Sequence, residues 1–112
     1  MKDLYSSLDT PSLLVDRTIL LRNITGMQDL ADRAGVALRP HTKTHRTPAI
    51  AAMQVKAGAK GITVAKIGEA EALAEDGVTG ILITSPVAAP GAIVRLAQLA
   101  GSAIGLMATL DD

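Results

Sequence analysis

The sequence predicts an α/β fold with a parallel sheet, because short apolar runs alternate with stretches of helical periodicity. Four apolar runs begin near residues 36, 61, 80 and 103, at spacings of 25, 19 and 23 residues that suit βα units with right-handed crossovers. Two of them, "GITVA" (61–65) and "ILIT" (81–84), are almost wholly apolar, which is typical of strands covered on both faces.

Two architectures fit this pattern, an open doubly wound sheet and a (β/α)8 barrel. Neither a GxGxxG nor a GxxxxGK[ST] sequence is present, so the nucleotide-binding signatures of open sheets are missing. Periodicity alone does not choose between the two. A barrel needs eight βα units and about 250 residues, whereas the 112 residues of this chain hold about four units. We therefore expect the chain to be the front part of something larger.

The first helix is predicted over residues 17–34, after an N-cap at Asp16 and before a terminating glycine, Gly35. Its apolar face is formed at intervals of three and four by Leu20, Ile24, Met27, Ala31 and Ala34. The segment "SLLV" (12–15) is predicted as a strand before this helix.

The remaining elements follow the same alternation. "VAL" (36–38) opens a strand, and Thr47-Pro48 starts a second helix that ends at Gly58. The alanine- and glutamate-rich stretch 68–77 is a third helix. A fourth helix, over 91–100, and a last strand, "AIGLMA" (103–108), complete the series.

Composition excludes several classes of protein. Hydrophobic residues make up 48% of the chain and charged residues 20%, which argues against disorder. Lys plus Arg equals Asp plus Glu, and Tyr5 is the only aromatic residue, so nucleic-acid binding is not expected. The chain has no cysteine, no secretory leader pattern and no membrane-length apolar run. We expect a soluble, cytoplasmic domain without membrane partners.

The octapeptide "RPHTKTHR" (39–46) carries the candidate site. If the strand persists through residue 43, then Arg39, His41 and Lys43 point to one side, and His45 follows if it continues. Sites in parallel βα folds lie at the carboxyl ends of strands, where Lys43 stands. An amine reacts with an aldehyde only when neutral, and desolvation and nearby cations favour that form. We predict that Lys43 is shielded from water and holds an aldehyde cofactor; an exposed loop lysine is the alternative.

His41 and His45 are four residues apart, which raises the question of a metal site. The segment is not predicted to be a helix, it lacks the glutamate of an HExxH motif, and Lys43 between the histidines would repel a cation. We therefore predict no metal ligands here. Both histidines are expected to line a pocket and to hydrogen bond to an anionic ligand.

The strings "DTPSLLVD", "LRPHTKTHRTP", "GITVAKIGEAEALAEDG" and "ILITSPV" resemble the N-terminal region of D-threonine aldolases and eukaryotic-type D-serine dehydratases. These are alanine racemase-like, fold-type III enzymes that use pyridoxal 5'-phosphate (PLP) at the mouth of a TIM barrel. The resemblance runs from about Asp9 to Val87 and favours the barrel. It implies that residues 1–112 are an incomplete alanine racemase-like barrel domain, without the C-terminal half of the barrel and the β domain.

The resemblance also implies roles for the residues of the octapeptide. Lys43 matches the lysine that forms the Schiff base with PLP and moves protons at the substrate α-carbon, and Arg39, His41 and His45 are expected to bind the cofactor. The rival amines are Lys56, Lys60 and Lys66. The family's divalent metal is held in the C-terminal domain, and this chain has no histidine after His45 and no cysteine to supply ligands.

Three functions stay open. The first is a PLP-dependent lyase that cleaves β-hydroxy-D-amino acids to glycine and an aldehyde, with D-serine dehydration or racemisation as sibling reactions. The second is a non-catalytic PLP-binding protein, and the third is an inactive fragment. The expected partner is a small D-amino acid, and a homodimer is a further expectation.

Overall fold

The computed structural model describes residue 3, residues 5–103 and residues 105–111. The helices are α1 (Arg17–Ala34), the 3-10 helix η1 (Thr42–Thr44), α2 (Pro48–Lys56), α3 (Ile67–Glu75) and α4 (Pro90–Ala100). The strands are β1 (Ile62–Val64), β2 (Ile81–Ile83) and β3 (Met107–Ala108). The strands form one parallel sheet in the order β1-β2-β3, so the predicted parallel α/β fold is confirmed.

The core lies between the sheet and the helices α2, α3 and α4. Ile62, Val64, Ile81 and Ile83 are at most 1% exposed, and they pack with Ala51, Ala70, Leu73 and Leu99 from α2, α3 and α4. Fully burying an aliphatic side chain of this size contributes about 1.5–3 kcal/mol. These four strand side chains therefore hold the helices on the sheet.

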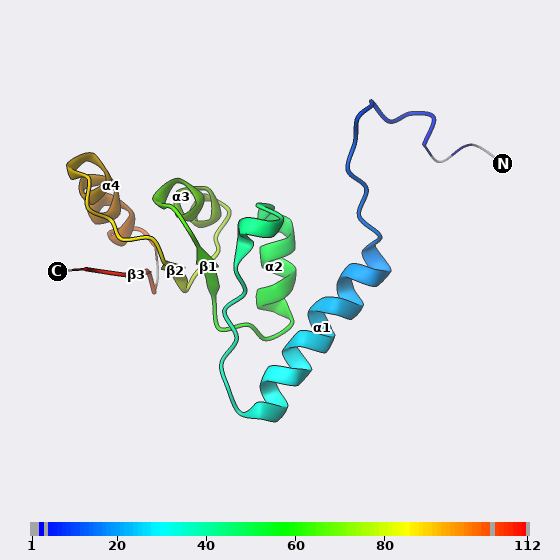
Figure 1. Ribbon diagram of the computed structural model, residues 1–112, viewed down its shortest axis with the longest axis horizontal. Coiled ribbons are helices and arrows are strands. Elements are labelled where there is room, and N and C mark those ends of the chain that lie inside the picture. Colours follow the sequence, from blue (N-terminus) through cyan, green and yellow to red (C-terminus); the bar gives the residue numbers. More distant parts are fainter. Residues whose placement is uncertain (1–2, 4, 104, 112) are drawn as a thin grey trace.

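Helix α1 forms where the sequence predicts it. The Asp16 carboxylate accepts a hydrogen bond from the Ile19 N–H, and Gly35 takes the left-handed conformation (φ 68°) that ends many helices. Figure 1 shows α1 at one end of an elongated molecule, away from the sheet. Part of its apolar surface is bare, since Met27 is 53% and Leu30 54% exposed.

Two predicted strands are absent from the described residues. Residues 12–15 belong to no strand, and Leu13 there is fully exposed. The run at 36–38 also forms no strand, although it leads to a single parallel bridge between His41 and Thr63. The last strand is shorter than predicted; it covers Met107–Ala108, and residue 104 of the predicted range lies outside the described residues.

Pro40 removes one hydrogen bond from the pairing between its segment and β1. The Lys60 N–H donates to Leu38 O at 2.9 Å and the Thr63 N–H to Pro40 O at 2.8 Å, so the two segments do lie alongside each other. A regular parallel ladder would next need an N–H at position 40 to reach Lys60 O, and proline has none. Lys60 O instead lies 3.4 Å from the Arg39 guanidinium.

Candidate active site

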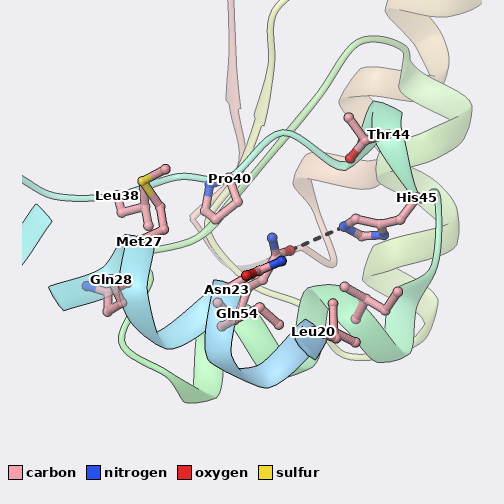
Figure 2. Close-up of a pocket in the computed structure, with 11 residues that line it drawn as sticks. Leu20, Asn23, Met27, Gln28, Leu38, Pro40, Thr44, His45 and Gln54 are labelled. Carbon is pink, nitrogen blue, oxygen red and sulfur yellow. Dashed lines mark hydrogen bonds between the residues drawn. The ribbon is translucent and has the colours of Figure 1, made fainter. Parts of the chain in front are cut away.

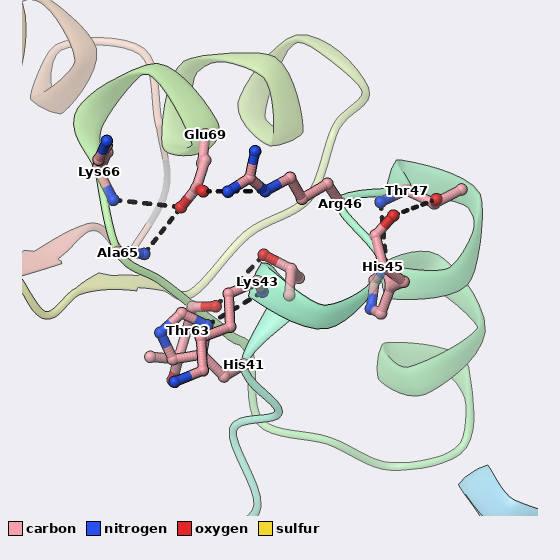
Figure 3. Close-up of polar contacts among 10 residues, drawn as sticks. His41, Lys43, His45, Arg46, Thr47, Thr63, Ala65, Lys66 and Glu69 are labelled. Carbon is pink, nitrogen blue, oxygen red and sulfur yellow. Dashed lines mark hydrogen bonds and ion pairs between the residues drawn. The ribbon is translucent and has the colours of Figure 1, made fainter.

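Lys43 lies in a tight turn at the carboxyl end of the sheet. The chain pairs with β1 at His41 and then turns into η1, whose N-cap is His41 and whose Thr42 is buried. The predicted extended strand through residue 43 is therefore wrong, because the backbone turns at Thr42. Figure 3 shows His41, Lys43 and Thr63 on one side of this turn and His45 on the other, over α2.

The prediction that Lys43 is shielded from water is wrong for the residues described. Its side chain is exposed, and it lies outside the two hollows that flank the turn, one beside Thr44 and His45 and the other beside Thr42 and Arg46. The position at the carboxyl end of the sheet is as predicted. An exposed primary amine there is accessible to an aldehyde from solvent.

Arg39 is directed to the opposite end of the sheet. Its Nη1 donates to Gly80 O at 2.7 Å, just before β2 begins, and lies 3.4 Å from Lys60 O, just before β1. The expectation that Arg39 stands beside Lys43 is therefore wrong. Glycine is required here, because a Cβ on Gly61 would lie 2.4 Å from Nη1 and 2.0 Å from Gly80 O.

Both histidines cap backbone N–H groups two residues further along the chain. His41 Nδ1 accepts from the Lys43 N–H at 3.1 Å, and His45 Nδ1 accepts from the Thr47 N–H at 3.0 Å. His45 Nε2 lies 3.3 Å from Gln54 Oε1, so the neutral tautomer with the proton on Nε2 satisfies both contacts. The histidines thus shape the two ends of the turn that carries Lys43.

His45 does line a pocket, but on the helical side of the turn (Figure 2). The pocket has a volume of about 490 Å³ and lies between α1, α2 and the segment before η1. Its wall is mostly apolar, with Leu20, Ile24, Met27, Leu38, Pro40 and Ile50. Lys43 is not part of this wall, so His45 lines a pocket separate from Lys43. The hydrogen bond of the histidines to an anionic ligand stays a prediction.

An ion pair that the sequence did not predict closes the turn. Arg46 Nε lies 3.7 Å from Glu69 Oε1, and Glu69 Oε2 accepts the N–H groups of Ala65 at 2.8 Å and Lys66 at 3.2 Å (Figure 3). Partial burial acts to raise the pKa of Glu69, but the two N–H groups, with Arg46 and His41, outweigh it and lower the pKa below its usual value. The sequence signal for this pair is a glutamate, Glu69, in the first turn of a helix that directly follows a strand.

The rival lysines are differently placed. Lys66 is the N-cap of α3 and is exposed, Lys56 ends α2, and Lys60 precedes β1 at the same end of the sheet as Arg39. Of these, Lys66 alone follows a strand. Within residues 3, 5–103 and 105–111, no three His, Asp or Glu side chains gather so that they could hold a metal ion. Over the same residues, no helix is both long and apolar enough for a membrane span.

Comparison with known proteins gives a consistent group of relatives. Residues 15–105 match the family model described as alanine racemase, N-terminal domain. The chain is 42% identical over 98 residues to a D-threonine aldolase of Arthrobacter sp, covering 88% of this chain and 26% of that protein. It is 40% identical over 112 residues to the D-threo-3-hydroxyaspartate dehydratase of Delftia sp. (strain HT23), covering 100% of this chain and 29% of that protein.

The solved structures agree with the sequences. The crystal structure of D-threonine aldolase from Filomicrobium marinum superposes with a TM-score of 0.89 at 40% identity, over 93% of this chain and 28% of that one. The chain thus spans under a third of the length of these relatives. With most of its residues matched by the family model and its fold matched by the solved aldolase, this chain belongs to the family of the alanine racemase N-terminal domain.

Proposed function

We propose that this chain is the N-terminal, PLP-binding segment of a lyase that acts on β-hydroxy-D-amino acids, of the D-threonine aldolase type. The observation that carries the proposal is the placement of Lys43, an exposed primary amine on a turn at the carboxyl end of a parallel sheet. That end is where parallel βα enzymes hold their cofactors. The 42% identical Arthrobacter relative named D-threonine aldolase supports this reaction class.

The residues present fit the cofactor's aldehyde. Lys43 would hold the cofactor through its ε-amine, the group that can bond covalently to an aldehyde. His41 Nδ1 accepts a hydrogen bond from the Lys43 N–H, and this bond fixes the position from which the lysine side chain leaves the turn. Bound PLP supplies an electron sink for the electrons of a breaking bond at the substrate α-carbon. In aldol cleavage, the Cα–Cβ bond breaks as the β-hydroxyl loses its proton and becomes the C=O of the aldehyde, and a proton is added at Cα to give glycine.

Dehydration of a β-hydroxy-D-amino acid is the second candidate. It is favoured by the 40% identity over all 112 residues to the hydroxyaspartate dehydratase of Delftia. In that reaction, the α-carbon loses a proton and the β-hydroxyl leaves as water. Hydrolysis of the dehydrated product then consumes one water and gives a 2-oxo acid and ammonia. The metal expected from the family resemblance would act on this hydroxyl, and its ligands are proposed to lie outside this chain.

The test is site-selective trapping of the cofactor. The chain is mixed with PLP, reduced with borohydride, digested, and analysed by mass spectrometry for pyridoxyl-lysine. We expect Lys43 to be modified in preference to Lys56, Lys60 and Lys66, and Lys43→Ala to remove that product while Lys66→Ala does not. Equal labelling of all four amines would contradict the proposal. Assays for glycine from D-threonine and for a 2-oxo acid from 3-hydroxyaspartate then separate lyase from dehydratase.

A non-catalytic PLP carrier remains a distinct outcome of the same experiment. Selective labelling of Lys43 without turnover of either amino acid would support cofactor binding by this chain and assign catalysis to residues beyond it. The absence of any Lys43-selective product would favour the inactive fragment.

A further inference from the structure

The turn that carries Lys43 is fastened at both ends. Its first end is the bridge between His41 and Thr63, where the chain pairs with β1. Its last residue is Arg46, shortly before α2 begins. The Arg46 N–H donates to Thr42 O at 2.7 Å, and the backbone of Arg46 is left-handed with φ 48°. Arg46 is the one described residue other than glycine with a positive φ. A bulky residue adopts this conformation only where other contacts compensate for its steric cost.

Glu69 provides the compensating contact. Its Oε2 is held by the N–H groups of Ala65 and Lys66, and its Oε1 lies 3.7 Å from Arg46 Nε. The side chain of Glu69 is 20% exposed and that of Arg46 is 74% exposed. The carboxylate is therefore held by the loop between β1 and α3, and the exposed partner is the arginine.

We propose that Arg46 and Glu69 are positioning residues that hold the Lys43 turn in the geometry needed to receive the cofactor. This inference rests on the proposed function of Lys43. The ion pair links the turn to the loop between β1 and α3, so it is a second attachment of the lysine turn, in addition to the His41 bridge to β1 itself. Orientation matters for a covalent site, because a reacting amine that samples many directions spends little time in the productive one.

The first test needs no cofactor. Hydrogen exchange of the His45 and Arg46 amides, both of which donate to Thr42 O, reports how long the turn stays closed. We expect Glu69→Gln to speed this exchange about two- to five-fold, the range for loss of a partly exposed ion pair. Glu71→Gln is the matched control, since Glu71 lies on the same helix but pairs with Arg95. Equal exchange rates in the two variants would contradict the claim that the Arg46–Glu69 pair holds the turn closed.

The second test separates the charge of Arg46 from its backbone conformation. Arg46→Gly keeps the left-handed turn without strain but loses the guanidinium, whereas Arg46→Lys keeps a cation. We expect Arg46→Gly to slow trapping of PLP at Lys43 about two- to five-fold and Arg46→Lys to restore most of the rate. If Arg46→Gly traps PLP at the same rate as the wild type, only the conformation of the turn matters. That result would overturn the positioning role of the Arg46 charge.

The third readout is the circular dichroism of the visible band of bound PLP, which depends on how the cofactor is oriented. Glu69→Gln is expected to weaken this signal at equal labelling, and Glu71→Gln to leave it unchanged. If Glu69→Gln speeds amide exchange yet leaves trapping and dichroism as in the wild type, the pair is merely structural and the proposal fails. If Lys43 of the wild type is not selectively labelled, the proposed function fails. The exchange experiment still tests whether the Arg46–Glu69 pair holds the turn closed. Should Glu69→Gln unfold, the two Arg46 variants test the pair from its exposed partner.

Discussion

Arg39 Nη1 lies 2.7 Å from the carbonyl oxygen of Gly80, although 41 residues separate the two in the sequence. This hydrogen bond joins the segment before η1 to the turn before β2, across the position of β1. The space for the guanidinium exists because Gly61 and Gly80 carry no side chains there. Arg39 thus fastens together the amino ends of the strands, and Lys43 stands beyond their carboxyl ends.

Gly61→Ala is expected to destabilise the chain by about 2–4 kcal/mol. The new Cβ would lie 2.0 Å from Gly80 O and 2.4 Å from Arg39 Nη1, and Gly61 has φ 158°, at the limit of what other residues adopt. Urea denaturation followed by far-UV circular dichroism measures the change. Gly26→Ala is the control, because nothing lies within 4 Å of its Cβ position. It should stabilise α1 by up to about 1 kcal/mol, and equal effects of the two changes would contradict the geometry.

Arg39→Lys is expected to cost about 1–2 kcal/mol of the free energy of unfolding. Both carbonyl oxygens are reached by one nitrogen, Nη1, which stands one bond further from the backbone than the ammonium of lysine. Denaturant titration of both proteins gives the difference. Arg33→Lys, in the last turn of α1, serves as the matched control and should change stability little. An unchanged free energy of unfolding in Arg39→Lys would show that the two contacts with carbonyl oxygens contribute no net stability.

Glu69 should contribute to stability at neutral pH and lose that contribution in acid. Because its pKa is lowered on folding from the ordinary value of 4.5, the folded state favours the ionised carboxylate above that pH. The contribution disappears as the pH falls through the folded-state pKa. The difference in the free energy of unfolding between wild type and Glu69→Gln should therefore shrink progressively below pH 4.5. A difference that stays constant from pH 7 to pH 3 (roughly the range that spans both protonation states) would refute this.

His45→Ala should destabilise the chain by about 1 kcal/mol, because the N–H of Thr47, the N-cap residue of α2, loses its acceptor. His45→Asn should retain much of the lost stability, since an asparagine oxygen also reaches an N–H two residues further on. Thermal or urea unfolding compares the three proteins. Identical losses in the alanine and asparagine variants would show that the imidazole acts through its contact with Gln54 rather than through the cap.

Local signals predicted the helices well. Asp16, Gly35 and Pro48 mark element ends by chemistry that acts within a few residues, and the structure confirms each of them. The strand at 36–38 failed because Pro40 removes one hydrogen bond of the ladder beside β1. The segment at 12–15 has the apolar composition of a strand. A strand also needs a neighbouring strand to pair with, and pairing depends on residues far away in the sequence, so a local pattern does not predict it.

The candidate site divides in the same way. The end of the sheet at which Lys43 lies follows from the order of strands and helices, which the sequence reveals. The directions of Arg39 and His45 do not, because they depend on contacts with Gly80 and Gln54, 41 and 9 residues away. The pairing of Arg46 with Glu69 also depends on the left-handed backbone of Arg46. A positive φ at a residue other than glycine has no reliable signal in the local sequence.

The bare aliphatic stretch Leu13–Val15 has a practical consequence for handling the polypeptide. Leu13 is 100%, Leu14 61% and Val15 62% exposed, so three consecutive aliphatic side chains face solvent. A short exposed aliphatic stretch of this kind promotes aggregation by pairing with a strand of another molecule, and concentrated stocks should therefore become turbid on storage. A single lysine at position 13 should keep them clear.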